Sequence, residues 1–214
     1  MNLWQEFKTH QGKPINKWMH YFPIYEKHLS GWRNKNLIFL EIGVSKGGSL
    51  QMWQKFFGPM ATIVGIDIDP ECAVHQERDI HVRIGDQSDP KFLESIITEF
   101  GTPDIILDDG SHVMGDIWKS FAFLYPKLSK NGVYIVEDLH TAYSEKFGGG
   151  VNNSESFMNI SKTFIDKLNA DYSPSTVTPD FMTRFTFGIS FYDSMIIYER
   201  GNIPIKSGVI APSE

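Results

Sequence analysis

Acidic side chains and a histidine gather in two short segments of the sequence. Asp108 and Asp109 end one apolar run, His112 follows Asp109 by three residues, and Glu137 and Asp138 end a second apolar run. Short runs rich in Ile, Leu and Val are typical of buried strands. Carboxylate and imidazole groups at the ends of neighbouring strands can hold a metal ion and accept a proton.

Three of these carboxylates indicate a metal site. Asp109, Glu137 and Asp138 should converge within a few ångströms, because the two strands that they end are expected to be neighbours. Such a concentration of negative charge is costly unless a cation neutralises it. Oxygen ligands without cysteine partners favour Mg²⁺, with Mn²⁺ as the alternative. A pair of acidic helix caps is the other interpretation of the same residues.

His112 is the candidate general base. An imidazole has an ordinary pKa of about 6.5 and can take a proton from a hydroxyl at neutral pH. A lone histidine is usually structural, but the carboxylates beside His112 favour a role in the chemistry. A second role, as a ligand of the metal, stays open.

A glycine-rich segment follows the first expected strand and precedes a helix. Gly43, Gly47 and Gly48 would let a ligand lie against bare backbone. The Gly-Lys-Ser/Thr ending of a nucleotide-triphosphatase loop is absent, and the spacing differs from the dinucleotide pattern G-x-G-x-x-G. Glu41, just before the glycines, would repel a pyrophosphate and suits a cationic ligand with an amino group and a sulfonium.

Polar residues also follow the second and third expected strands. Asp67 can accept hydrogen bonds from both hydroxyls of a ribose, which NAD would also require. Asp86 and Gln87 can bind the exocyclic amine of an adenine. Each alone could be a turn residue or a helix cap. Together with Glu41 they favour a cofactor that contains a nucleoside.

The elements that position these residues alternate between short apolar runs and longer amphipathic segments. This β-α-β rhythm predicts an α/β fold: a Rossmann-like, seven-stranded mixed sheet of five parallel strands and a C-terminal antiparallel hairpin, with helices on both faces. The expected strands cover residues 38–42, 62–67, 80–85, 105–108, 132–136, 189–192 and 195–200. Residues 1–36 form an aromatic-rich helical segment that packs near the mouth of the sheet, and residues 37–214 form the main domain. The polar loops 148–156 and 173–179 are candidate lids.

Composition excludes several classes of protein. The chain of 214 residues has a net charge of -6 and no cluster of basic residues, which argues against binding to nucleic acid. Its single cysteine and the lack of a leader pattern at its start predict a reducing cytoplasm. No apolar run approaches the roughly 20 residues that cross a bilayer, so no membrane span is expected. A homo-oligomer is compatible with the sequence.

Taken together, the motifs resemble the class I S-adenosylmethionine-dependent methyltransferases over residues 37–200. The segments LEIGVSKGGSL, GIDIDP, GDQSD, LDDGSH and VEDLH are similar to the Mg²⁺-dependent sugar O-methyltransferases of macrolide biosynthesis and to the cephalosporin hydroxylase/rhamnosyl O-methyltransferase group. The resemblance implies S-adenosylmethionine and Mg²⁺ as cofactors. It also implies a small-molecule or glycoside substrate that is methylated on a sugar hydroxyl.

The resemblance assigns roles by position. The metal ligands would be Asp109, Glu137 and Asp138, the base His112, and the residues around the cofactor Glu41, Gly43, Ser45, Gly47, Ser49, Asp67, Asp86, Gln87 and Asp108. Catechol-type methyltransferases have a lysine where this chain has His112, so a sugar or aliphatic hydroxyl is favoured over a catechol. Two alternatives remain: an NAD-dependent oxidoreductase, which leaves the acidic residues unexplained, and a non-catalytic nucleotide-binding module.

Overall fold

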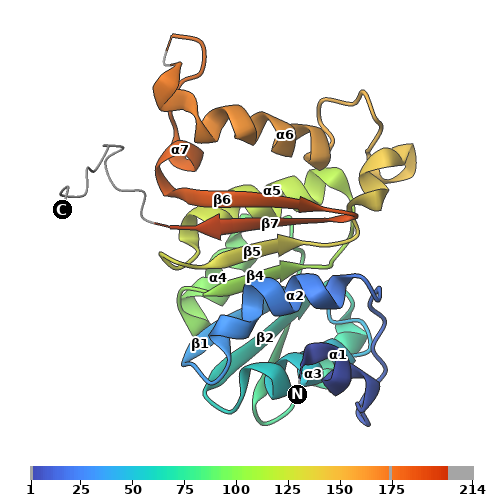
Figure 1. Ribbon diagram of the computed structural model, residues 1–214. Coiled ribbons are helices and arrows are strands. Elements are labelled where there is room, and N and C mark those ends of the chain that lie inside the picture. Colours follow the sequence, from blue (N-terminus) through green and yellow to red (C-terminus); the bar gives the residue numbers. More distant parts are fainter. Residues whose placement is uncertain (1, 174, 202–214) are drawn as a thin grey trace, which may run out of the picture.

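The computed structural model describes residues 2–173 and 175–201. The end of the predicted main domain, residues 202–214, and Pro174 of the predicted loop 173–179 lie outside the described residues. The described strands form one sheet in the order β3-β2-β1-β4-β5-β7-β6 (Figure 1). Their bounds are β1 Leu37–Ile42, β2 Ala61–Asp67, β3 Ile80–Ile84, β4 Ile105–Asp108, β5 Val133–Val136, β6 Thr186–Tyr192 and β7 Met195–Arg200.

The first five strands are parallel, and β7 runs antiparallel to both β5 and β6. This confirms the predicted mixed sheet with a C-terminal hairpin. The largest difference is in β6, which begins at Thr186 rather than at residue 189. A register shift between Thr186 and Gly188 lets the pairing with β7 continue back to Thr186.

Helices cover both faces of the sheet. On one face lie α1 (Leu3–Lys8), α2 (Tyr21–Leu29) and α3 (Gly48–Phe57), and on the other lie α4 (Pro90–Phe100), α5 (Met114–Leu124), α6 (Phe157–Leu168) and α7 (Phe181–Phe185) (Figure 1). Short 3₁₀ turns complete the chain: η1 Ser30–Trp32, η2 Pro70–His75, η3 Tyr125–Lys127, η4 Leu139–Tyr143, η5 Glu145–Phe147 and η6 Ala170–Tyr172. Across the described ranges, no helix has the length and apolarity to cross a membrane.

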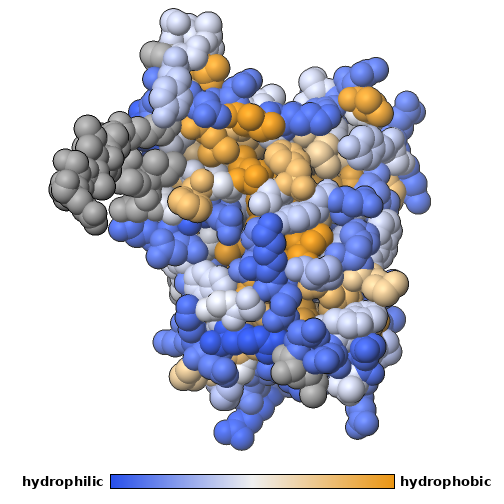
Figure 2. Space-filling view, in the orientation of Figure 1, coloured by the Kyte–Doolittle hydropathy of each residue, from blue (hydrophilic) through white to orange (hydrophobic). Residues whose placement is uncertain are grey.

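Two hydrophobic cores form because successive side chains of a strand point to opposite faces. Phe39 and Ile63 pack with α2 and α3, whereas Leu40 and Val64 pack with α4 and α5. The central strands are therefore buried on both faces, as expected for a parallel sheet. Figure 2 shows hydrophobic side chains over α6, β6 and β7, above a mostly hydrophilic lower half of the same face.

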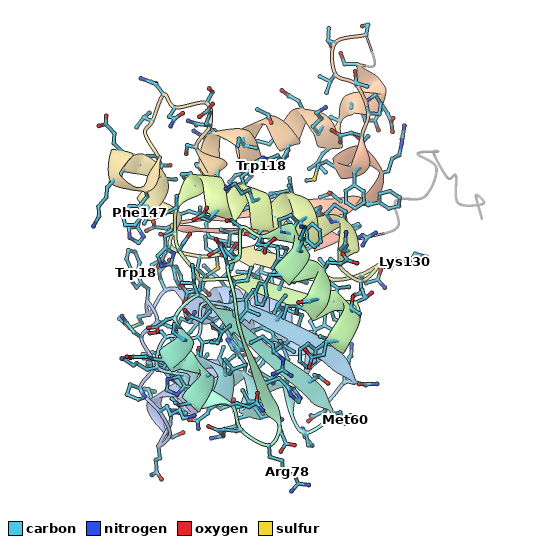
Figure 3. The ribbon with its side chains drawn as sticks, turned by 180° about the vertical axis from the view of Figure 1, so that it is seen from behind. Trp18, Met60, Arg78, Trp118, Lys130 and Phe147 are labelled. Carbon is cyan, nitrogen blue, oxygen red and sulfur yellow. The ribbon has the colours of Figure 1, made fainter. Side chains whose placement is uncertain are left out.

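The order of the strands reverses between β1 and β4. The chain passes from β1 outward to β3 and then returns to β4 on the other side of β1. In open α/β sheets, ligands bind at the carboxyl ends of the strands beside such a reversal. Figure 3 places Trp18 and Phe147 at this end of the molecule, with Met60 and Lys130 at the opposite end. The segment between α1 and α2 therefore lies over the carboxyl ends of the strands.

Candidate active site

A cavity of about 550 Å³ opens at the carboxyl ends of the parallel strands. Its size is in the range of small-molecule sites. Its wall contains residues 14–18 of the N-terminal segment and most of the predicted site residues: Gly43, Ser45, Ser49, Asp67, Asp86, Gln87, Asp109, His112, Glu137 and Asp138. Three predicted cofactor residues, Glu41, Gly47 and Asp108, are not part of this wall.

Gly43 joins the loop after β1 to the loop after β4. Its φ is +97°, and a Cβ at this position would lie 2.1 Å from the carbonyl oxygen of Asp109. Only glycine combines this left-handed conformation with so close an approach of two backbones. The glycine-rich loop and the carboxylate-bearing loop therefore share one rigid contact.

Replacing Gly43 with alanine should lower the free energy of unfolding by about 2 to 4 kcal/mol. The new methyl group would add left-handed strain and overlap a backbone that cannot easily move. Urea unfolding measures the loss. Gly115→Ala is the matched control, because a Cβ at Gly115 of α5 meets no atom within 4 Å and alanine favours a helix. Equal stability of the two variants would contradict the role of the close contact.

Asp67 ends β2 and is held by backbone groups. Its Oδ2 accepts hydrogen bonds from the N–H groups of Val44 (2.8 Å) and Ser45 (3.1 Å), and its Oδ1 accepts one from Asp69 (2.9 Å). Burial raises the pKa of Asp67, but these N–H groups outweigh burial and the pKa is lowered. The carboxylate is thus fixed and ionised at the wall of the cavity, with lone pairs left for a ligand.

Gln87 and Asp108 make hydrogen bonds to the protein itself. The Gln87 amide donates to Asp108 Oδ1 (3.2 Å) and its oxygen accepts from the N–H of Ser111 (2.8 Å). Asp108 also accepts from Ser120 Oγ (2.7 Å), and burial raises the pKa of Asp108 to about 6. These side chains link the loops after β3 and β4 beneath the cavity. Their roles in cofactor binding, like that of exposed Asp86, stay predictions.

Asp109, His112 and Asp138 come together as a possible metal site. One ligand atom from each lies within 4.8 Å of the other two. Nε2 of His112 is 3.9 Å from Asp109 Oδ1 and 3.9 Å from Asp138 Oδ2. His112 and Asp138 have φ values of +58° and +53°, a left-handed conformation that costs energy outside glycine and is concentrated at functional sites. Two carboxylates and an imidazole form a donor set that fits a divalent cation such as Mg²⁺ or Mn²⁺.

Glu137, the third predicted metal ligand, is buried and faces the N-terminal segment. Its Oε2 accepts a hydrogen bond from Lys17 Nζ (2.8 Å), and its Oε1 accepts one from the hydroxyl of Tyr25. Burial and the neighbouring Asp109 raise the pKa of Glu137, and Lys17 opposes this rise. The structure therefore places Glu137 beside the Asp109–His112–Asp138 group, with both oxygens bonded to protein.

Lys17 is a site residue that sequence reasoning missed. Its Nζ lies 2.6 Å from Asp109 Oδ2 and 3.7 Å from Glu41 Oε1, and its side chain is only 3% exposed. Burial lowers the pKa of Lys17, but Asp109, Glu137 and Glu41 outweigh it and raise the pKa well above its ordinary value. Lys17 is therefore a permanent cation in the acidic cluster. It lies 92 residues from Asp109 in the chain, and no local pattern marks it.

Glu41 lies fully buried behind the glycine-rich loop. Its Oε2 accepts a hydrogen bond from Ser49 Oγ (2.8 Å), and within the described ranges its Oε1 has no hydrogen-bond partner. Burial raises the pKa of Glu41 to about 7, against the opposing effect of Lys17. Oε1 of Glu41 instead faces the ammonium of Lys17 at 3.7 Å. A buried carboxylate at this point disfavours a pyrophosphate.

The sequence is similar to those of known methyltransferases. The chain is 36% identical over 209 residues to mycinamicin VI 2''-O-methyltransferase of Micromonospora griseorubida, and the match covers 92% of this chain and 52% of that protein. It is 34% identical to demethylmacrocin O-methyltransferase of Streptomyces fradiae, covering 86% of this chain and 50% of that protein. No protein-family model matches the chain.

A solved structure decides the fold family. The MycE methyltransferase of the mycinamycin biosynthetic pathway, in complex with Mg, SAH and mycinamycin VI, superposes with a TM-score of 0.85 at 31% identity, over 96% of this chain and 56% of that one. This chain has the fold of the class I methyltransferases. It is related in sequence to sugar O-methyltransferases of natural-product biosynthesis and spans about half the length of the curated relatives that it matches.

Proposed function

We propose that this methyltransferase-fold chain transfers a methyl group from S-adenosylmethionine to a hydroxyl of a sugar or glycosylated natural product, with Mg²⁺ as its metal. The observation that carries the proposal is the position of His112, 3.9 Å from both Asp109 and Asp138 in the cavity that Gly43 and Asp67 also line. A proton acceptor thus lies beside two carboxylates that can hold a metal, in a pocket with the features of a nucleoside site.

The residues have distinct roles in this reaction. The loop at Gly43 and the carboxylate of Asp67 would hold the cofactor, and the oxygens of Asp109 and Asp138 that face His112 would hold Mg²⁺. Glu137 lies beside them, with both of its oxygens bonded to Lys17 and Tyr25. A bound Mg²⁺ lowers the pKa of a hydroxyl and fixes its position. Nε2 of His112 accepts the hydroxyl proton. The substrate oxygen forms a bond to the methyl carbon as the carbon–sulfur bond breaks, and the electron pair stays on sulfur in S-adenosylhomocysteine.

The experiment that tests the proposal is calorimetric titration with S-adenosylmethionine and, separately, with NAD, each with Mg²⁺ and with EDTA. Binding of S-adenosylmethionine without NAD binding supports the proposal, and a methyl-transfer assay on glycosylated macrolides then tests the acceptor. Binding of NAD alone would favour the oxidoreductase alternative. The buried Glu41 beside the glycine-rich loop argues against that result.

Replacing Asp67 with asparagine should weaken binding of S-adenosylmethionine by about 10- to 100-fold. A hydrogen bond to a charged acceptor contributes roughly 1.5 to 3 kcal/mol, and each 1.4 kcal/mol is a tenfold change in affinity. Calorimetry gives the dissociation constant. Asp69→Asn is the matched control, since Asp69 lies two residues further on, is exposed and does not line the cavity. Wild-type affinity in Asp67→Asn would remove this residue from the cofactor site.

We also propose that the protein acts in a reducing cytoplasm on small-molecule acceptors. Cys72, the only cysteine of the chain, is buried as a free thiol whose Sγ lies 3.4 Å from the carbonyl oxygen of Ser45. A net charge of -6 is unfavourable for binding to nucleic acid. These features support a cytoplasmic enzyme whose acceptor is not a nucleic acid.

A further inference from the structure

The carboxylates of Asp109 and Asp138 are held in the same way. Oδ2 of Asp109 accepts a hydrogen bond from Lys17 Nζ (2.6 Å), while its Oδ1 faces His112 Nε2 at 3.9 Å. Oδ1 of Asp138 accepts a hydrogen bond from the hydroxyl of Tyr21 (2.7 Å), while its Oδ2 faces His112 Nε2, also at 3.9 Å. In each carboxylate, one oxygen is bound by the N-terminal segment and the other is directed at the possible metal position.

The groups that hold these oxygens are themselves fixed. Tyr21, the first residue of α2, is 1% exposed, and its hydroxyl also accepts a hydrogen bond from the N–H of Asp138 at 3.2 Å. Lys17 follows a segment that is anchored on α3, because the N–H of Lys13 donates to Gln51 Oε1 (2.8 Å). Rigid partners of this kind orient ligands and limit their rotamers.

A buried cation in this cluster can either take the place of a metal ion or neutralise carboxylates beside the metal position. The position of Lys17 distinguishes these two roles. An ammonium group that took the place of a metal ion would contact the oxygens that face His112. Lys17 Nζ instead contacts Oδ2 of Asp109, the oxygen away from His112, together with Oε2 of Glu137. It neutralises part of the acidic charge without occupying the space between Asp109 Oδ1 and Asp138 Oδ2.

We propose that Lys17 and Tyr21 are positioning residues of the metal site, which orient Asp109 and Asp138 so that one oxygen of each is available to a divalent cation. The inference rests on the proposed function and assigns a role in it to the N-terminal segment. Metal binding at this site then depends on two side chains that do not contact the metal. Loss of a side chain that holds a metal ligand in place typically costs 10- to 100-fold in metal affinity.

The test is titration of the whole chain with Mn²⁺, followed by calorimetry and by electron paramagnetic resonance of the bound ion. Tyr21→Phe and Lys17→Met should each raise the Mn²⁺ dissociation constant by about 10- to 100-fold and change the spectrum of the bound ion. Lys13→Met is the matched control, because Lys13 lies on the same segment and pairs with the exposed Glu77 at 2.6 Å. It should keep the wild-type dissociation constant.

Tyr21→Phe removes a single hydroxyl, so it keeps the test valid if Lys17→Met does not fold. Unchanged Mn²⁺ affinity and spectrum in the folded variants would overturn the inference, as would tighter binding by Lys17→Met, which would show that the ammonium competes with the ion. If the wild type transfers methyl groups and binds Mn²⁺ while the variants match it, only the inference fails. If the wild type binds S-adenosylmethionine but no Mn²⁺, the metal part of the proposed function fails and the inference fails with it.

Discussion

Replacing His112 with alanine should reduce kcat for methyl transfer by about 10²- to 10⁴-fold, the usual contribution of a positioned general base. Nε2 of His112 lies between Asp109 and Asp138, and its side chain is one-quarter exposed to the cavity, so a hydroxyl held there can reach it. Affinity for S-adenosylmethionine should stay close to the wild-type value, because His112 is not among the residues expected to contact the cofactor. Steady-state kinetics and calorimetry measure the two quantities.

The backbone at position 112 requires a second variant. His112 has a φ of +58°, which asparagine adopts more readily than alanine. His112→Asn should therefore lose the same activity with a smaller loss of stability. His81→Ala, on β3 and away from the cavity wall, should keep full activity. Full activity in either His112 variant would exclude the residue as the base, and loss of metal affinity without loss of folding would assign it to the metal instead.

The strands could be predicted because their signal is local. The run Ile105–Asp108 has the predicted bounds, and β7 does too, since both are short apolar runs between turn residues. The start of β6 could not be predicted in the same way. Phe187, Ile189 and Phe191 alternate with small or polar residues, but Gly188, a poor strand former, precedes the expected start at residue 189. Pairing with β7 extends the strand back to Thr186.

The site could be predicted as far as strand topology determines it. Parallel strands bring their carboxyl ends to one edge, so Asp67, Asp109 and Asp138 meet at a single cavity. The direction of each side chain is set by partners that are distant in the chain. Gln87 and Asp108 are drawn to each other and to Ser120 beneath the cavity, which no spacing in the sequence indicates.

In the aromatic N-terminal segment, too, the sequence predicts packing but not the polar contacts with distant residues. Packing near the mouth of the sheet was the expectation, and Phe22 and Tyr25 do belong to the core with Trp53. Two hydroxyls of α2 also bind carboxylates more than 110 residues away, Tyr21 to Asp138 and Tyr25 to Glu137. Aromatic composition predicts burial, but a single hydroxyl that reaches a carboxylate of the site depends on the complete tertiary structure.

Replacing Asp109 with asparagine should reduce kcat/KM by about 10³-fold even with excess Mg²⁺. Asp109 belongs both to the ion pair with the N-terminal segment and to the metal group: its Oδ2 binds Lys17, and its Oδ1 faces His112. The carboxamide keeps the shape but removes the negative charge from the metal site and from the ion pair. Several kcal/mol of charge stabilisation depend on such a ligand, and each 1.36 kcal/mol is a tenfold change in rate.

The same substitution should lower the free energy of unfolding by only about 1 to 3 kcal/mol, because Glu137 still pairs with the buried Lys17 at 2.8 Å. Urea unfolding, Mn²⁺ titration and kinetics on one preparation separate these effects. Asp104→Asn is the control at the other end of β4: its Oδ2 accepts the N–H of Ile38 at 2.9 Å, and a carboxamide oxygen can still do so. Wild-type metal affinity in Asp109→Asn would show that the ion binds elsewhere, since the Asp109–His112–Asp138 group cannot lose its charge there and keep its affinity for a divalent cation.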